Sequence, residues 1–294
     1  MTADYQIVFE ADHRQPCLEL RMVLLAAGIS AQAVRTGKKW TLRVFAHDLS
    51  AAVREIEAYI AEQEESPKAT VSRPSSRGKM TGLVFYVVVL SFFSFIASTS
   101  SAEALLSVGS TNAGKMMDGE WYRAVTALTL HQDFGHLLSN LIFGVLFGFL
   151  ASEMLGGGLG WLLILLGGAM GNALNAVLRE ATHVSIGAST AVFAALGIAV
   201  SQALWASFKT DEPLVKKWSP LIGGVLLLAF LGIGGENTDV GAHFTGFFSG
   251  VVLGGAALYL PKQLNRNTGA QLACGAGAIV CLAACWGVAL LHIG

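Results

Sequence analysis

Charged side chains are scarce in this sequence of 294 residues. Only 13% of the residues are Asp, Glu, Lys or Arg, while 53% are hydrophobic. Because soluble domains carry roughly 25% charged residues, this composition excludes an entirely soluble protein and indicates a membrane protein. A surplus of basic residues is also missing, since the formal net charge is −1, and this argues against a nucleic-acid partner.

Targeting and cross-linking signals are sparse as well. No charged n-region followed by a short apolar run opens the chain, so we expect no cleavable signal peptide. The four cysteines are Cys17, alone near the start, and Cys274, Cys281 and Cys285, whose spacing places them on one helical face. A metal or redox cluster is one interpretation of these three residues. Helix packing by small, soft side chains is the other, and it is the one we favour.

Residues 1–65 differ in kind from the rest of the chain. A short β-like run at 5–9 precedes an amphipathic helix that ends at Gly28, and a hairpin around Gly37 precedes a second helix. This order predicts a small soluble α+β domain, in which no motif identifies a ligand. Residues 66–79 are rich in Pro and Ser and hold four basic residues, which predicts a basic linker that meets a cytoplasmic membrane surface.

Apolar runs long enough to span a bilayer recur from residue 80 onwards. We place seven transmembrane helices, near residues 80–99, 136–153, 160–178, 187–207, 219–235, 241–260 and 271–292. The fold class expected is therefore an all-α polytopic membrane bundle that follows the α+β domain. Residues 80–260 form a six-span core in this interpretation, and residues 261–294 form a cytoplasmic loop and a seventh helix.

The charges of the connections predict the orientation of the bundle. The basic segments 66–79, 209–217 and 261–266 lie on one side of successive pairs of helices. The positive-inside rule therefore places the N-terminus in the cytoplasm and the C-terminus outside. The segment 103–135 then lies outside, and it is too long and too apolar for a plain hairpin loop, so we expect it to fold against the bilayer.

Three polar clusters fall at the same outer depth in this topology. His136 and Asn140 begin the second span four residues apart, on one helical face. Ser189 begins the fourth span and His243 begins the sixth. Ionisable residues inside a membrane are costly and are functional candidates by default. A lone intramembrane histidine is more often a packing residue, and a lone serine more often bonds its own helix, so the coincidence in depth carries the argument.

Serine and histidine at one depth indicate nucleophilic chemistry. Ser189 needs a base to become a nucleophile, and a neutral imidazole is the usual one. His243 is the better candidate for the base because small residues follow it, among them Gly246 and Gly250, and these let the sixth helix approach the fourth closely. No Asp or Glu within a span is placed to orient His243, so we predict a Ser–His dyad without a third member.

The surroundings of Ser189 suit a developing oxyanion. Gly187 and Ala188 leave the backbone before the serine open to a substrate carbonyl. The N-terminus of the fourth helix supplies free N–H groups and a favourable dipole. His136 and Asn140 are predicted to donate to the same oxyanion.

These residues resemble the rhomboid family of intramembrane serine proteases. The family patterns HxxxN, GxSG and AHxxGxxxG correspond here to His136–Asn140, Gly187–Thr190 and Ala242–Gly250. The resemblance covers residues 80–260, with the motifs in the family's order. Further similar elements are Trp121, Arg123 and His131 in the outer segment, and Phe193, which stands where the family has an aromatic residue packed on the catalytic histidine.

The resemblance implies a protease of the bacterial inner membrane that cleaves single-span proteins near the outer face through Ser189 and His243. Its partners are transmembrane substrates and the lipid bilayer, and neither a cofactor nor a metal is expected. Thr190 departs from the family pattern, which has glycine there. We interpret it as a variant that alters rate or specificity by narrowing the path of the substrate.

Four other classes of protein fit the sequence less well. A zinc site at 131–136 has two His and one Asp, but not in the HExxH spacing. An aspartyl intramembrane protease needs paired acidic residues within spans, and a transporter is expected to contain internal repeats; the sequence has neither. A catalytically weak or inactive rhomboid-like protein that binds or escorts membrane proteins is the alternative that remains, and Thr190 is the only feature in its favour.

The remaining charged and indole side chains have simpler interpretations. Acidic and basic residues at the ends of loops are interpreted as solvated boundary charges: Arg179, Glu180, Glu236 and Asp239. Two tryptophans are interpreted as interfacial anchors, Trp121 and Trp161.

Overall fold

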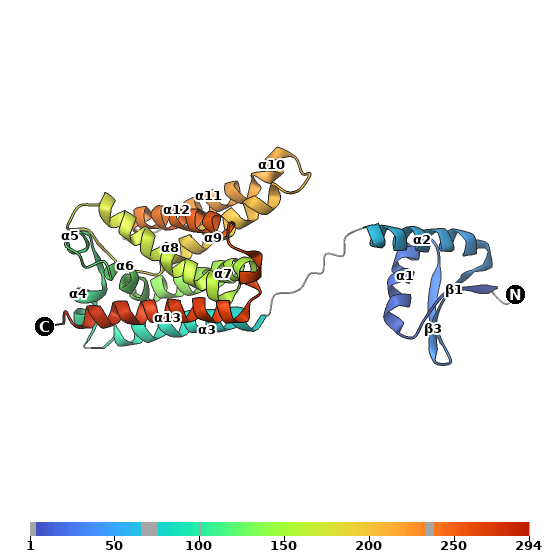
Figure 1. Ribbon diagram of the computed structural model, residues 1–294, viewed down its shortest axis with the longest axis horizontal. Helices are drawn as coiled ribbons and strands as arrows, with labels where there is room; N and C mark the ends of the chain where they lie inside the picture. The colour runs from blue at the N-terminus through green and yellow to red at the C-terminus, as the bar shows by residue number, and fades with distance from the viewer. Residues whose placement is uncertain (1–3, 66–75, 100, 233–237, 294) are drawn as a thin grey trace. The chain divides into compact units, whose positions relative to one another are not determined.

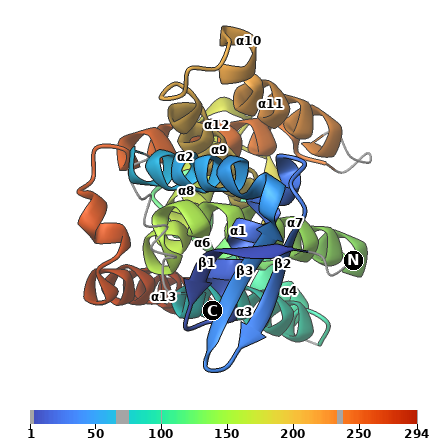
Figure 2. The same ribbon diagram turned by 90° about the vertical axis from the view of Figure 1, so that its right-hand side faces the viewer.

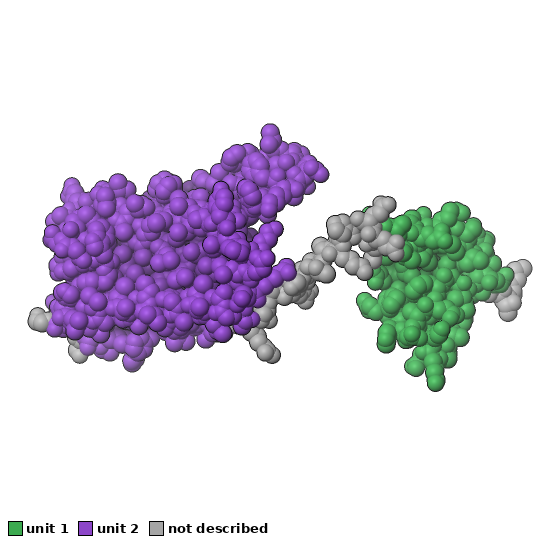
Figure 3. Space-filling view, viewed as in Figure 1, with its two compact units in different colours: residues 1–72 green, residues 73–294 purple. Residues whose placement is uncertain are grey.

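The structure is a computed structural model that describes residues 4–65, 76–99, 101–232 and 238–293. The chain divides into two compact units, residues 1–72 and residues 73–294 (Figure 3). Most of the predicted linker at 66–79 lies outside the described residues.

The first unit is a three-stranded antiparallel sheet with two helices. Its elements are β1 (Tyr5–Ala11), α1 (Arg14–Ala26), β2 (Ala31–Thr36), β3 (Lys39–Phe45), the 3₁₀ turn η1 (Ala46–Asp48) and α2 (Leu49–Glu65). The central strand is β3, with β1 and β2 on either side (Figure 2). Gly28 after α1 and Gly37 in the β2–β3 turn have φ of 78° and 64°, values that glycine adopts without strain. The α+β fold predicted for this region is confirmed.

Apolar side chains of both helices and of the sheet form a core of their own in this unit. The fully buried members include Cys17 and Leu24 of α1 and Leu42 and Val44 of β3, and Ala52 of α2 packs on them. Cys17 is therefore a packing residue.

The second unit is a bundle of long helices that run side by side (Figure 1). The long helices are α3 (Ser76–Ile96), α7 (Phe134–Leu155), α8 (Gly157–Leu178), α9 (Ser189–Ser207), α11 (Ser219–Gly232), α12 (Val240–Ala257) and α13 (Thr268–Leu290). Among the described residues, five of them are long and apolar enough to cross a membrane, and Met80–Ile96 and Ser219–Gly232 are shorter apolar helices. The predicted polytopic helical bundle is confirmed.

Helix α9 lies at the centre of the bundle. Every residue from Thr190 to Ser201 is buried, and α9 packs against α7, α8, α11 and α12. A helix that is apolar on all sides is expected to be buried in this way. Because α9 is held on several sides, the residue at its start has a fixed position in the bundle.

The segment between α3 and α7 folds into short elements that pack on the bundle. They are α4 (Ala102–Gly109), β4 (Thr111–Asn112), α5 (Ala113–Met117), α6 (Arg123–Thr126) and the 3₁₀ turn η2 (Ala127–Thr129). Strand β4 pairs with β5 (Val184–Ser185), so that Thr111 faces Ser185. This pairing ties the segment to the stretch of chain that leads into α9.

Two small elements complete the bundle at the connections on either side of α11 and α12. They are α10 (Leu214–Lys217) and the 3₁₀ turn η3 (Lys262–Asn265).

Gln271 of α13 accepts hydrogen bonds from the backbone N–H groups of Gly158 and Leu159, at 2.8 and 3.0 Å, and so caps the start of α8. The seventh helix is therefore joined to the six-helix core by polar contacts.

Trp161, which the sequence indicates as an interfacial anchor, also packs between helices near the start of α8. Its indole packs on Gly82 of α3 and on Gly148 of α7, where an added Cβ would collide with the ring. The ring also lies 5.1 Å from that of Tyr86. The absence of side chains at the two glycines creates the space for the indole, which joins three helices.

Candidate functional site

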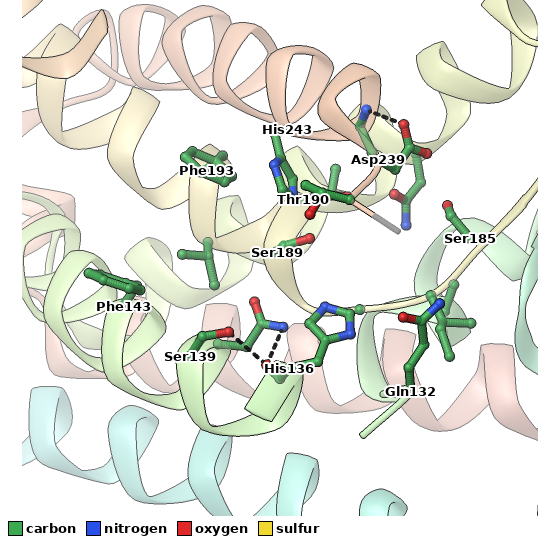
Figure 4. Close-up of a pocket in the computed structure, with 18 of the residues that line it drawn as sticks. Gln132, His136, Ser139, Phe143, Ser185, Ser189, Thr190, Phe193, Asp239 and His243 are labelled. Atoms are coloured by element: carbon green, nitrogen blue, oxygen red, sulfur yellow. Dashed lines mark hydrogen bonds between the residues drawn. The ribbon is translucent and has the colours of Figure 1, made fainter. Parts of the chain in front are cut away.

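The predicted polar residues surround one cavity of about 720 Å³. Most of its lining comes from α7, the segment 183–187, the start of α9 and the start of α12 (Figure 4). Single residues of other elements complete it: Ala127, Asn172, Arg179 and Leu231. The structure brings Ser189, His243, His136 and Asn140 together there, with Gly187, Thr190 and Phe193. Ala188, Trp121, Arg123, His131, Gly246 and Gly250 are not among the residues that line this cavity.

Ser189 is the first residue of α9. The preceding Ala188 is buried, and no side chain caps the helix. The first N–H groups of a helix have no partner within it, so these donors are available at the place where the Ser189 side chain enters the cavity. Gly187 has φ of 135°, which makes the sharp turn before the helix. A side chain at this glycine would come within 2.7 Å of the His136 ring.

His243 lies in the first turn of α12 and is buried. Its Nδ1 is 2.9 Å from the carbonyl oxygen of Gly232, at the end of α11. A carbonyl only accepts hydrogen bonds, so Nδ1 carries the proton, and in the neutral ring Nε2 has a free lone pair. The ring centroids of Phe193 and His243 are 4.5 Å apart, so the packed phenyl ring restricts the orientation of the imidazole. Gly232 is a feature that the sequence analysis missed, because a backbone acceptor has no signature in sequence.

Ser189 and His243 point into the same part of the cavity (Figure 4). Within the described residues, no hydrogen bond joins the two side chains. Catalytic hydrogen bonds are often long in proteins without substrate and shorten when it binds, so this geometry is compatible with a nucleophile and its base.

His136 and Asn140 close the opposite side of the cavity. His136 is half-buried beside Gly187, and the Asn140 amide donates to the His136 carbonyl at 3.0 Å. The Tyr86 hydroxyl donates to the Asn140 carbonyl at 2.8 Å and so ties α3 to α7. His131, which lies before α7, packs edge-on to His136 at 5.2 Å. Burial and the nearby His136 lower the pKa of His131 to about 4, so its ring is neutral near pH 7.

Thr190 of α9 packs against Gly246 of α12 and Gly171 of α8. The Thr190 methyl group lies where a Cβ at Gly171 or Gly246 would be. The side chain is buried, with 2% of its surface exposed. Much of this residue therefore fills a gap between helices, although it also borders the cavity.

Arg123 organises the outer segment at a distance from the cavity. Its side chain is 2% exposed and donates from Nη1 to the carbonyls of Ser107 and Ser110, at 3.0 Å each. Its Nε donates to the Glu120 carboxylate at 2.6 Å. Trp121 is 45% exposed and takes no part in this network.

Replacing Arg123 with methionine is expected to destabilise the bundle by about 2–4 kcal/mol, because two carbonyls and a carboxylate lose their donors. Arg123→Lys keeps the charge but not the forked geometry, so we expect a smaller loss. Thermal unfolding in detergent measures both. Lys216→Met is the control, because it removes an exposed ion pair with Glu212. Equal unfolding midpoints for Arg123→Met and wild type would contradict the prediction.

Asp239 is a second feature that the sequence analysis misjudged. Its side chain is 13% exposed and is bound by Arg179 and His183, so the interpretation of Asp239 as a solvated boundary charge is wrong. Arg179 is 41% exposed, as expected, although it pairs with Asp239. Burial acts to raise the pKa of Asp239, but hydrogen bonds from His183 and from the Ala242 N–H outweigh it and hold the pKa below its ordinary value. Glu180 is exposed as expected, and Glu236 lies outside the described residues.

The fold and the site together define an integral membrane protein with a serine and several histidines around a cavity among its helices. Residues 118–260 match the Rhomboid domain family model. Residues 118–260 thus form a rhomboid domain.

Curated relatives agree with this family. The chain is 29% identical to YdcA of Bacillus subtilis (strain 168), provisionally named a rhomboid protease, over 46% of this chain and 67% of that protein. It is 29% identical to the rhomboid protease GluP of the same organism, over 69% of this chain and 39% of that protein. It is 31% identical to the chloroplastic rhomboid-like protein 11 of Arabidopsis thaliana, over 51% of this chain and 49% of that protein. The chain thus spans about half or less of the length of the last two relatives. The rhomboid domain supports an intramembrane protease function in general terms.

Proposed function

We propose that this protein is an intramembrane serine protease in which Ser189 is the nucleophile and His243 the general base. The observation that carries the proposal is that both side chains enter one cavity at the uncapped start of α9. The bond from His243 Nδ1 to the Gly232 carbonyl leaves Nε2 as the atom that accepts a proton. A backbone carbonyl thereby fixes the tautomer, which is the task of the acid in a triad.

The cavity contains groups for each step of acyl transfer. Ser189 Oγ attacks the carbonyl carbon of the scissile peptide, and its proton passes to His243 Nε2. The developing oxyanion accepts hydrogen bonds from the N–H groups at the start of α9, from Asn140 and from His136. His243 then gives the proton to the leaving amine as the C–N bond breaks. Water, deprotonated by His243, hydrolyses the acyl-enzyme and regenerates Ser189.

The substrates we propose are single-span membrane proteins, cleaved near the outer membrane face. The cavity lies among the first turns of α7, α9 and α12, so it is near one end of these spans and away from the middle of the bundle. From the basic segments of the sequence we propose that the N-terminal unit lies in the cytoplasm and the C-terminus outside, in the bacterial inner membrane.

The test is cleavage of a model single-span substrate in liposomes by wild type and by Ser189→Ala. Removal of the nucleophile is expected to lower kcat by about 10⁴-fold or more. Ser201→Ala is the control on the same helix, because its hydroxyl donates to the Ile198 carbonyl at 2.9 Å and Ser201 is not among the residues that line the cavity. Equal cleavage by wild type and Ser189→Ala would contradict the proposal. Substrate that wild type binds but leaves intact would favour the binding or escort function.

A further inference from the structure

Asp239 lies between the two chain segments that carry the proposed nucleophile and base. It precedes α12 and caps it: Oδ1 accepts from the Ala242 N–H at 3.1 Å. The same oxygen accepts from Arg179 at 3.0 Å. Oδ2 lies 2.7 Å from both Asn175 Nδ2 and His183 Nε2. Each oxygen thus has two partners, which fills the capacity of a carboxylate.

The four partners belong to three segments of the bundle. Asn175 lies in the last turn of α8, and Arg179 directly follows this helix. His183 directly precedes β5, in the stretch that continues through Gly187 to Ser189, and its backbone carbonyl accepts from the Ala113 N–H at 3.0 Å. The Ala242 N–H belongs to α12, one residue before His243. Asp239 therefore joins the segment that leads to the serine with the turn that carries the base.

The backbone at this junction is closely packed. A Cβ at Gly241 would come within 2.6 Å of Arg179 Nη2 and 2.7 Å of Asn175 Oδ1. The start of α12 thus rests directly on the end of α8, and the Asp239 carboxylate is held on the same two side chains. A helix cap alone needs one acceptor atom, so the three additional partners of Asp239 serve another purpose.

We propose that Asp239 is the positioning residue of the site, which sets the distance between Ser189 and His243 by joining His183, α8 and α12 through one carboxylate. This inference rests on the proposed protease function. Asp239 does not touch the reacting atoms in this scheme. It acts by holding the two reacting side chains in register, and misplacement of reacting groups by about 1 Å can cost about 100-fold in rate.

Two substitutions separate the bridge from the cap. Asp239→Ser keeps a capping oxygen but is too short to reach His183 and α8. Asp239→Asn also caps, but it loses the charge that faces Arg179. Its amide has one acceptor oxygen where the carboxylate has two, so its NH2 group faces partners that are themselves donors. For both we expect kcat to fall by about 10- to 100-fold with KM unchanged within about twofold, because binding of the substrate helix does not depend on this distance.

The matched control is Asn267→Ser, which changes the residue that caps α13 through the Ala270 N–H at 2.9 Å. This variant alters a helix cap in the same bundle without touching the cavity, and we expect wild-type kcat. The labelling rate of Ser189 by a fluorophosphonate probe is the second readout, because it reports activation of the serine without a membrane substrate. It is expected to fall in parallel with kcat in both Asp239 variants, measured at a temperature below their unfolding midpoints, which we expect to be lower than that of wild type because donors around Asp239 lose their acceptor.

A double-mutant cycle tests the bridge itself. If His183 acts through Asp239, His183→Gln and Asp239→Asn lower kcat together by much less than the product of their separate effects. Additive effects would overturn the proposed bridge. Wild-type kcat and labelling in both Asp239 variants would overturn the positioning role while leaving the protease function in place. Wild type that neither cleaves nor labels at Ser189 would overturn the protease function and this inference with it.

Discussion

Replacing His243 with alanine is expected to lower kcat as far as Ser189→Ala does, with no further loss in the double variant. A serine hydroxyl is a weak nucleophile without its base, so removing either partner of a catalytic unit costs about as much as removing both. His243 is the proposed proton acceptor because its Nδ1 is engaged with the Gly232 carbonyl. The measurement is single-turnover cleavage in liposomes for the two single variants and the double variant.

Chemical rescue makes this prediction more specific. Loss of the imidazole leaves a gap beside Phe193, whose ring lies 4.5 Å from that of His243. Added imidazole is expected to restore part of the activity of His243→Ala and none of that of Ser189→Ala. His47→Ala is the control, because this histidine is an exposed residue of the first unit. Activity within about tenfold of wild type in His243→Ala would show that another group, such as His136, is the base.

The order and type of the long helices could be predicted because each depends on local composition. Runs of apolar residues about as long as a bilayer is thick specify a spanning helix wherever they occur. The predicted runs at 160–178 and 187–207 agree with α8 and α9 within a few residues at each end. The folding of the outer segment could not be predicted in detail, because pairs such as Thr111 and Ser185 are set by packing between residues far apart in the chain.

The gathering of the polar residues could be predicted, but their exact contacts could not. Ser189 and His243 begin spans that run in the same direction, so topology alone brings them to one depth. The Gly232 carbonyl could not be identified, because every residue has one. Asp239 resembled any other charge at the end of a loop, and only the arrangement of α8 beside α12 shows that Asn175 and Arg179 surround it.

Gly250→Ala is expected to destabilise the bundle by about 3 kcal/mol or more and to abolish cleavage. A Cβ at Gly250 would collide with the backbone oxygen, carbonyl carbon and Cα of Ala194 in α9, and backbone atoms cannot move aside as a flexible side chain can. Overpacking of this kind typically costs about 1–3 kcal/mol, occasionally more, when the helices have to separate. Separation would also move Ser189 away from His243, because they lie on the two helices that meet here.

Gly255→Ala provides the comparison on the same helix. Gly255 has no atom within 4 Å of an added Cβ, and alanine favours a helix over glycine by up to about 1 kcal/mol. We therefore expect unchanged or slightly raised stability and normal cleavage for this variant. The two glycines differ in whether another backbone lies against them, so opposite changes in the unfolding midpoint would attribute the loss in Gly250→Ala to the close contact of α9 and α12. A similar loss of stability in both variants would instead show that the added methyl group within α12 causes it. The close contact of α9 and α12 would then not be the reason why Ser189 and His243 stay together.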